Sequence, residues 1–188
     1  MQNEISLNTA EHRVRKKVQG KYRWQRIGVR AGLIAFLFIP FLLSMIKIGD
    51  IQFTFMLWTI PLFVFVDGFI LRHLFRYVDI EYEYTVVSGE LRVDIIYGNA
   101  RRKEWVAKKF ADMTAIAPYK DQYKAAAEDS SINNVYDATS STDSPDCYYC
   151  LFNDENDDKC VLFFEATTKI LKQAKLFNVI TVLSEVTY

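Results

Sequence analysis

The stretch "EYEYTVVSGELRVDIIY" (Glu81–Tyr97) contains two runs of β-branched and aromatic residues, which are separated by Ser88 and Gly89. Polar and apolar residues alternate in both runs, and this alternation is typical of half-buried strands. A two-residue connection that contains glycine joins antiparallel strands tightly. The stretch therefore predicts a β-hairpin with one face in a core.

Further strands are predicted after this hairpin. A loop over 99–103 precedes a third strand over 104–110, and a fourth strand over 114–119 ends near Pro118. These short strands and tight turns predict an antiparallel meander.

Two stronger strands, over 147–152 and 160–166, flank the acidic turn 153–159. The turn lacks the residue order and the glycine of an EF-hand loop, so a charged hairpin tip explains it better than a calcium site. The last segment has apolar residues at helical spacing, and Thr167 or Thr168 is the predicted N-cap. We expect this helix to cover one open end of the sheet.

The strand pattern stops between the fourth strand and this acidic hairpin. Residues 120–146 are polar, with many small residues and few hydrophobic ones, apart from a possible helical turn near Ala126. Such composition predicts a long, mobile insertion. It is either a plain exposed loop, which we favour, or a segment that is phosphorylated or binds a partner.

Two long apolar runs precede the sheet. Residues 31–48 carry one charge, at Lys47, and residues 51–71 carry one charge, at Asp67. A helix needs about 20 apolar residues to cross a bilayer core about 30 Å thick. Both runs are apolar on every face, which favours a transmembrane hairpin over a buried hairpin of a soluble protein. A cleaved signal peptide fits poorly, because the second run follows at once.

The charge distribution predicts the orientation of this hairpin. Net charge is zero overall, but residues 1–30 hold eight basic and two acidic residues. Basic flanks stay in the cytoplasm, so both termini should be cytoplasmic and the turn at Gly49 and Asp50 should face outside. We interpret Pro40 and Pro61 as kinks within the two spans.

Three parts of the chain follow from these patterns. Residues 1–30 are predicted to form a basic cytoplasmic segment near anionic lipid headgroups, residues 31–76 a two-helix transmembrane hairpin, and residues 77–188 a β-rich cytoplasmic domain. The expected location is the cell membrane, with two crossings. Nothing in the composition indicates nucleic-acid binding.

A carboxylate inside an apolar run needs an explanation. In an antiparallel hairpin centred near residue 49, facing residues have numbers that sum to about 98, so Arg30 and Asp67 should lie at one depth. An unpaired charge is costly in a membrane. We therefore predict a structural ion pair between these two residues, with Gly32 and Gly68 permitting close approach. The alternative is an ion or proton site at Asp67.

The chain lacks the usual signatures of catalysis. It has no G-x-S-x-G motif, no H-E-x-x-H motif and no glycine-rich phosphate loop. Cys147 and Cys150 form a C-x-x-C, but in a strand they point to opposite faces, and the cytoplasm favours free thiols there and at Cys160. We predict a protein that is not an enzyme, with no catalytic residues, no cofactor and no metal ligands.

The segment "EYEYTVVSGELRVDIIYGNARRKEW", the short strands and the terminal helix resemble bacterial pleckstrin-homology-like (PH-like) domains. The whole layout resembles small two-helix membrane proteins of clostridial bacteria that carry such a domain in the cytoplasm. This resemblance implies a bent, partly open antiparallel β-barrel capped by a C-terminal helix, an α+β domain. Lipid-binding members of the wider family place basic residues in the first hairpin loop. Here the basic cluster Arg101, Arg102 and Lys103 lies in the second loop, which argues against specific phosphoinositide binding.

Two functions remain open. The first is a membrane-anchored, non-enzymatic interaction module that binds a protein partner or the membrane surface, with Arg101, Arg102 and Lys103 as possible contacts. The second is a small oligomeric transport or channel subunit that uses Asp67. The scarcity of polar residues within the spans favours the first function.

Overall fold

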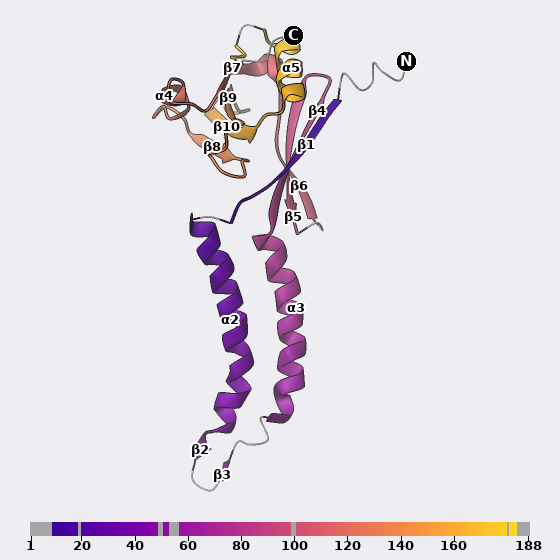
Figure 1. Ribbon diagram of the computed structural model, residues 1–188, viewed down its shortest axis with the longest axis vertical. Coiled ribbons are helices and arrows are strands. Elements are labelled where there is room, and N and C mark those ends of the chain that lie inside the picture. Colours follow the sequence, from indigo (N-terminus) through magenta and orange to yellow (C-terminus); the bar gives the residue numbers. More distant parts are fainter. Residues whose placement is uncertain are drawn as a thin grey trace. The chain divides into compact units, whose positions relative to one another are not determined.

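The computed structural model describes residues 9–18, 20–48, 51–52, 57–98, 101–179 and 181–183. The chain divides into two compact units, each described separately below (Figure 1). One unit is rich in strands and contains most of the residues before Val18 and after Ile80. The other is helical and contains Val18–Ile80 with Tyr97–Ala100.

The first sheet has the strand order β1-β4-β5-β6. Its strands are β1 (Thr9–Arg15), β4 (Ile80–Val87), β5 (Glu90–Tyr97) and β6 (Arg101–Lys109). Strands β4 and β5 form the hairpin that the sequence predicts. Strand β6 begins within the predicted loop 99–103, so that loop is shorter than expected.

Strand β1 corrects the prediction of a single basic segment over residues 1–30. It pairs antiparallel with β4, with Arg13 opposite Glu83 and Arg15 opposite Glu81. Ala10 and Val14 are buried, and the His12 ring lies 5.9 Å from the Tyr84 ring. This strand was missed because its alternation is one of charged against small residues, without the β-branched run that usually marks a strand.

The turn between β4 and β5 depends on Gly89. Ser88 and Gly89 have φ angles of 52° and 81°, the left-handed geometry that two-residue hairpin turns require. A Cβ atom on Gly89 would lie 2.6 Å from ring carbons of Phe177. Glycine therefore serves both the turn and the close approach of the C-terminal helix.

The second sheet has the order β7-β9-β10-β8. Its strands are β7 (Met113–Pro118), β8 (Asn134–Asp137), β9 (Cys147–Asn153) and β10 (Lys159–Glu165). Strand β8 is parallel to β10, and the other pairs are antiparallel. The described strands of this unit form two four-stranded sheets instead of the single bent barrel that the resemblance implies. A 3-10 turn, η2 (Phe110–Asp112), lies between β6 and β7, where the chain passes from one sheet to the other.

Strand β10 is buried on both faces. Its residues Cys160–Phe164 are all buried. The Phe164 ring meets the Tyr84 ring of the first sheet at a centroid distance of 6.2 Å, and the Tyr84 hydroxyl donates to the Ala138 carbonyl at 2.6 Å. Val161 and Phe163 point to the opposite face, into a second cluster of buried residues.

The segment after β7 covers this second face. It includes α4 (Lys124–Ala127), in which Ala127 is buried, and β8. The Tyr119 ring packs edge-on against the Phe163 ring at 5.0 Å. The possible helical turn near Ala126 is present as α4. The prediction of a loop without strands over 120–146 is wrong for β8. A few aromatic and small residues suffice there, because β10 supplies most of the apolar surface.

The C-terminal helix forms as predicted. Helix α5 spans Thr168–Phe177, and the Thr167 side chain accepts a hydrogen bond from the Ile170 amide at 3.3 Å. The Asn178 side chain donates to the carbonyl oxygens of Phe110 and Met113, at 2.7 and 3.0 Å. These bonds hold the end of α5 against η2 and the start of β7.

The helical unit contains α2 (Gly20–Ser44) and α3 (Ile60–Val78). Two-residue strands β2 (Lys47–Ile48) and β3 (Ile51–Gln52) pair between them. The predicted turn at Gly49 and Asp50 lies outside the described residues. Helix α2 starts eleven residues earlier than the predicted span at residue 31.

The two prolines differ in their positions. Pro40 lies inside α2, as the sequence predicts. Pro61 lies in the first turn of α3, where its missing N–H costs nothing, so its interpretation as a kink within a span is wrong. As a result, α3 begins about nine residues later than the apolar run at residue 51.

The register of the helices agrees with the predicted antiparallel hairpin. The rings of Phe36 and Phe63, whose numbers sum to 99, lie 5.0 Å apart. At the open end, Arg26 Nη2 lies 3.1 Å from Asp79 Oδ1. Among the described residues, one helix, Tyr22–Ser44, is long and apolar enough to cross a membrane, and a shorter apolar helix covers Leu57–Ile70.

Truncation of Phe163 tests whether the segment after β7 covers β10. We expect Phe163→Ala to lower the free energy of unfolding of the intact chain by about 3–5 kcal/mol, since it opens a cavity between packed layers. The control Val135→Ala, at a side chain that is 62% exposed on β8, should change it by less than about 1 kcal/mol. Urea denaturation gives both values. Equal, small losses would show that the segment does not pack on β10.

Candidate functional site

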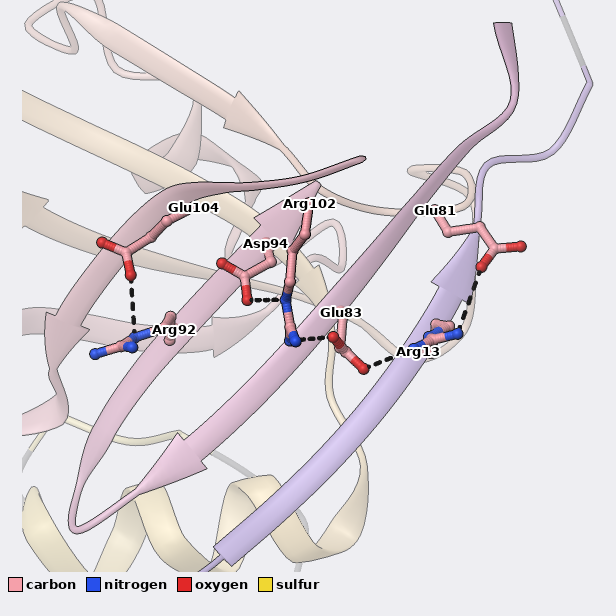
Figure 2. Close-up of polar contacts among 7 residues, drawn as sticks. All are labelled: Arg13, Glu81, Glu83, Arg92, Asp94, Arg102 and Glu104. Atoms are coloured by element: carbon pink, nitrogen blue, oxygen red, sulfur yellow. Dashed lines mark hydrogen bonds and ion pairs between the residues drawn. The ribbon is translucent and has the colours of Figure 1, made fainter. Parts of the chain in front are cut away.

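The outer face of the first sheet carries charged side chains from all four strands. Along β4, Tyr82 and Tyr84 are buried in the core, so the intervening Glu81 and Glu83 point to the other face. The same alternation on β5 buries Val93 and turns its charged neighbours outward. We call the resulting surface the ionic face, and Figure 2 shows contacts among seven of its residues. Its charged residues are Glu11, Arg13, Arg15, Glu81, Glu83, Glu90, Arg92, Asp94, Arg102 and Glu104.

Arg102 is at the centre of the ionic face (Figure 2). Its Nε donates to Asp94 Oδ2 at 2.7 Å, and its Nη2 contacts Glu83. Glu83 also accepts from Arg13 Nη2 at 2.9 Å. One guanidinium on β6 and one on β1 therefore share a carboxylate on β4, which links these three strands by side chains although β5 separates β4 from β6 in the sheet.

Three further ion pairs lie toward the rims. Arg15 Nε lies 3.8 Å from Glu81 Oε1 across the β1–β4 pairing. Arg92 contacts Glu90 at 3.3 Å and Glu104 at 3.3 Å. Opposite charges that face each other across strands stabilise a sheet modestly, by roughly 0.2–1 kcal/mol per pair.

Burial makes the central carboxylates depend on their arginines. Asp94 is 5% exposed, and a carboxylate so buried is costly unless it is paired and hydrogen-bonded. The same kind of contact stabilises the charged form of the exposed arginines. The hydrogen bond from Arg13 to Glu83 raises the pKa of Arg13, and the bond from Arg92 to Glu90 raises the pKa of Arg92.

The ionic face is hollowed and net negative. A cavity of about 730 Å³ lies over it. The charged residues that line this cavity are Glu11, Glu90, Asp94 and Glu104 on the acidic side and Arg92 and Arg102 on the basic side. Both arginines are already engaged by carboxylates of the same face. The cavity therefore suits a positively charged group better than a phosphate.

The predicted basic cluster is divided by the pleat of β6. Arg102 lies on the ionic face, whereas Trp105 stacks against Tyr82 on the core side. Strand alternation places Arg101 and Lys103 on the same side as Trp105. All three residues are exposed, but Arg102 is committed to Asp94 and Glu83. A role of Arg101, Arg102 and Lys103 in lipid or partner contact stays a prediction.

Arg30 and Asp67 line one cavity of about 460 Å³ beside the helices, so the structure brings them to the same level. Asp67 is 6% exposed, and neither of its carboxylate oxygens has a hydrogen-bond partner among the described residues. The ion pair between them stays a prediction.

Several cations of the N-terminal segment are paired with acids. Arg13 and Arg15 bind glutamates of β4, and Arg26 binds Asp79. Lys16 lies 3.6 Å from Asp137 and donates to the Tyr82 hydroxyl at 3.3 Å. Fewer charges of this segment are thus available to anionic headgroups than its composition implies.

The three cysteines are free and buried. Cys147 belongs to the second cluster of buried residues, together with Val161. Cys150 lies on the other face of β9, as strand alternation predicts. Burial raises the pKa of Cys147 to about 12 and also raises that of Cys150, which keeps both as unreactive thiols. Within the described residues, no three or more His, Cys, Asp or Glu side chains are grouped to hold a metal ion.

Comparison with known families adds one result to this geometry. Residues 9–183 match the family described as Bacterial PH-like domain (DUF6106). The chain belongs to this family. The match begins at the first residue of β1 and ends after α5, so the helical unit lies inside the matched region of this PH-like protein. No curated protein and no solved structure matches the chain.

The sequence predicted none of the ionic face except Arg102. One signal was present: Arg13 and Arg15 have the same two-residue spacing as Glu81 and Glu83, as two paired strands require. That signal has meaning only once residues 9–15 are recognised as a strand. Asp94 was not predicted as a site residue, because it lies in an apolar run whose pattern already indicates a strand.

Removal of the central arginine tests the ionic face. In Arg102→Met, Asp94 and Glu83 lose a shared cation while they remain largely buried. We expect a loss of about 1 kcal/mol in the free energy of unfolding, discounted because Arg102 itself is half exposed. The matched control Arg101→Met removes an exposed neighbouring charge and should change stability by less than about 0.5 kcal/mol. Thermal or urea unfolding of both variants measures the difference. Equal losses would show that the arginine contacts contribute nothing specific.

Proposed function

We propose that this PH-like protein is a membrane-anchored, non-enzymatic interaction module. In this proposal α2 and α3 cross the membrane as a hairpin, and the ionic face binds a basic surface of a protein partner. The observation that carries it is the pairing of β1 with β4, since these strands flank the helical unit in the chain.

The β1–β4 pairing returns the chain to the same sheet after the two helices. Arg15, just before the helices, lies opposite Glu81, just after them. A chain that leaves one sheet and returns to it must cross any membrane an even number of times. Helix α2 has the length and composition of a span. The pairing therefore supports a second crossing by α3, although its apolar stretch is the shorter one.

The surface of the two helices also supports insertion. Their outward side chains are mostly large and apolar, with Phe65 75% exposed and Leu62 61% exposed. An exposed apolar surface of this extent is unfavourable in water and marks a contact with lipid or protein. Helix α3, at 19 residues, is about 28 Å long, close to the thickness of a bilayer core.

The cytoplasmic placement rests on charge. Basic residues flank the open end of the hairpin on both sides, at Arg23 and Arg26 and again at Arg72. Positive flanks are retained in the cytoplasm. Both sheets would then lie in the cytoplasm together with the termini.

The ionic face supports a protein partner over a lipid. Its cavity is lined by more carboxylates than arginines, and anionic headgroups would be repelled by this excess. PH-like domains are generally non-catalytic interaction modules, which agrees with the lack of catalytic motifs. A basic protein surface matches the charge of this cavity.

A channel that uses Asp67 is the weaker candidate. Apart from Arg30 and Asp67, the side chains that line the cavity beside the helices are apolar. A path for cations needs several polar groups along its length, and the neighbouring guanidinium would repel a cation at this level.

Capture of the partner from native membranes tests the proposal. The full-length protein is extracted in mild detergent, and the proteins that accompany it are identified and quantified. The variant Glu11→Lys with Glu104→Lys reverses two exposed charges at the cavity and should reduce the captured partner by about tenfold or more. The control Glu155→Lys, at the exposed tip between β9 and β10, should capture as much partner as the wild type.

Three results would contradict this function. They are an undiminished partner in the double variant, recovery of the wild-type protein in the soluble fraction, and tight binding of the wild-type cavity to vesicles of anionic lipid.

A further inference from the structure

The cavity beside α2 and α3 has an unusual lining. It measures about 460 Å³ and has apolar walls formed by Leu33, Ile34, Leu37 and Val64. Its remaining lining residues are Arg30, Asp67 and Gly68. Most of these side chains are exposed, so the cavity is an open groove on the surface of the hairpin. A groove of this kind in lipid is a place where another helix can pack.

Asp67 is a buried acid on the wall of this groove. The residue is more than nine-tenths buried, yet neither carboxylate oxygen has a hydrogen-bond partner within the part of the chain that the structure describes. A buried carboxylate in this condition is strongly unfavourable unless a donor or a cation reaches it. Because Asp67 lines the groove, whatever fills the groove is in position to supply that donor.

The groove is complementary to itself. The antiparallel register places Arg30 and Asp67 at one level of the hairpin, on the wall of the same cavity. A twofold axis along the membrane normal keeps every residue at its own depth. It would bring Arg30 of a second copy to the level of Asp67 of the first, and the reverse. A guanidinium has five N–H donors, so Arg30 can bind this carboxylate in addition to the contacts within its own chain.

Room for close approach is present at the same site. A Cβ atom added to Gly68 would have no neighbouring atom within 4 Å. Small residues at a helix surface let two backbones come near enough for side chains to bond across them. Gly68 adjoins Asp67, so the approach is closest where the carboxylate needs its partner.

We propose that the groove is filled by the same groove of a second copy, in a twofold dimer in which Arg30 of each hairpin binds Asp67 of the other. This proposal rests on insertion of the hairpin in the membrane. It explains why one groove holds both a buried acid and a base, which neither a lipid chain nor an uncharged helix would require.

A charge-complementation experiment in bilayers tests the dimer. Full-length protein with two different fluorescent labels is reconstituted in lipid vesicles, and energy transfer is measured as the protein-to-lipid ratio is varied. We expect Arg30→Asp and Asp67→Arg, each alone, to weaken self-association by about tenfold or more, since like charges then meet across the axis. Asp67→Asn, which keeps the volume, should weaken it less.

Mixing the two charge variants gives the decisive result. A groove with two acids then faces a groove with two bases, so energy transfer between the variants should return toward the wild-type level. Pairing within one hairpin predicts no recovery on mixing and recovery only when both changes are on one chain. The control Arg23→Asp changes an exposed charge on α2 outside the groove and should leave association unchanged.

The outcomes separate this proposal from the proposed function. Wild-type protein that is inserted yet monomeric at every ratio overturns the dimer alone, as does a lack of recovery on mixing. Capture of a different membrane protein through Asp67 would also overturn it, because the occupant would then be another chain. Protein that fails to enter bilayers overturns the membrane anchor and the dimer together.

Discussion

The antiparallel pairing of β1 with β4 is the constraint on which the rest of the structure depends. It joins a strand that precedes the helices to one that follows them, with Arg15 opposite Glu81. Pairing two strands that are separated by so many residues costs conformational entropy, although this cost grows only slowly with the length of the intervening chain. The backbone ladder, the cross-strand ion pairs and the packing of α2 on α3 offset it. The family match starts at Thr9 and includes both helices.

The same pairing creates the candidate site. Without β1, Glu81 and Glu83 would be carboxylates at the edge of a three-stranded sheet; with it, each faces an arginine. Arg102 completes the arrangement by reaching Asp94 from β6. Because the arginines are used within the face, the acidic excess around the cavity determines what can bind there. This is the opposite of a basic headgroup site, and it is the basis for the proposal of a protein partner.

The parts of the fold with local signals could be predicted from the sequence. The β4–β5 hairpin, the strands β9 and β10, and the capped helix α5 each carry their own pattern of turn or cap residues. The helix register followed from simple antiparallel geometry, and the contact of Phe36 with Phe63 confirms it. The level shared by Arg30 and Asp67 follows from that register. The pair itself is not tested by the single chain.

The parts that depend on distant partners could not be predicted in this way. Strand β1 has a weak pattern of its own and is stabilised by charges about 70 residues away. The packing of the segment after β7 on β10 was not predicted, because that segment has a polar composition. The continuous apolar run Cys160–Phe164 was the available signal, since a strand buried on both faces needs a layer on each side. Most residues of the ionic face were not predicted, because the face depends on the pairing of β1 with a strand that is distant in the sequence.

The central claim is that the helices cross a membrane as a hairpin closed by one sheet. The most direct measurement is labelling of three single-cysteine variants, Asn3→Cys, Asp50→Cys and Ser184→Cys, in intact cells with a membrane-impermeant thiol reagent. The native cysteines are buried and add little background. A hairpin with cytoplasmic termini predicts labelling of Asp50→Cys alone, with the other two labelled only after the cells are opened. Labelling of either terminal position from outside, or the absence of labelling at Asp50→Cys, would contradict it.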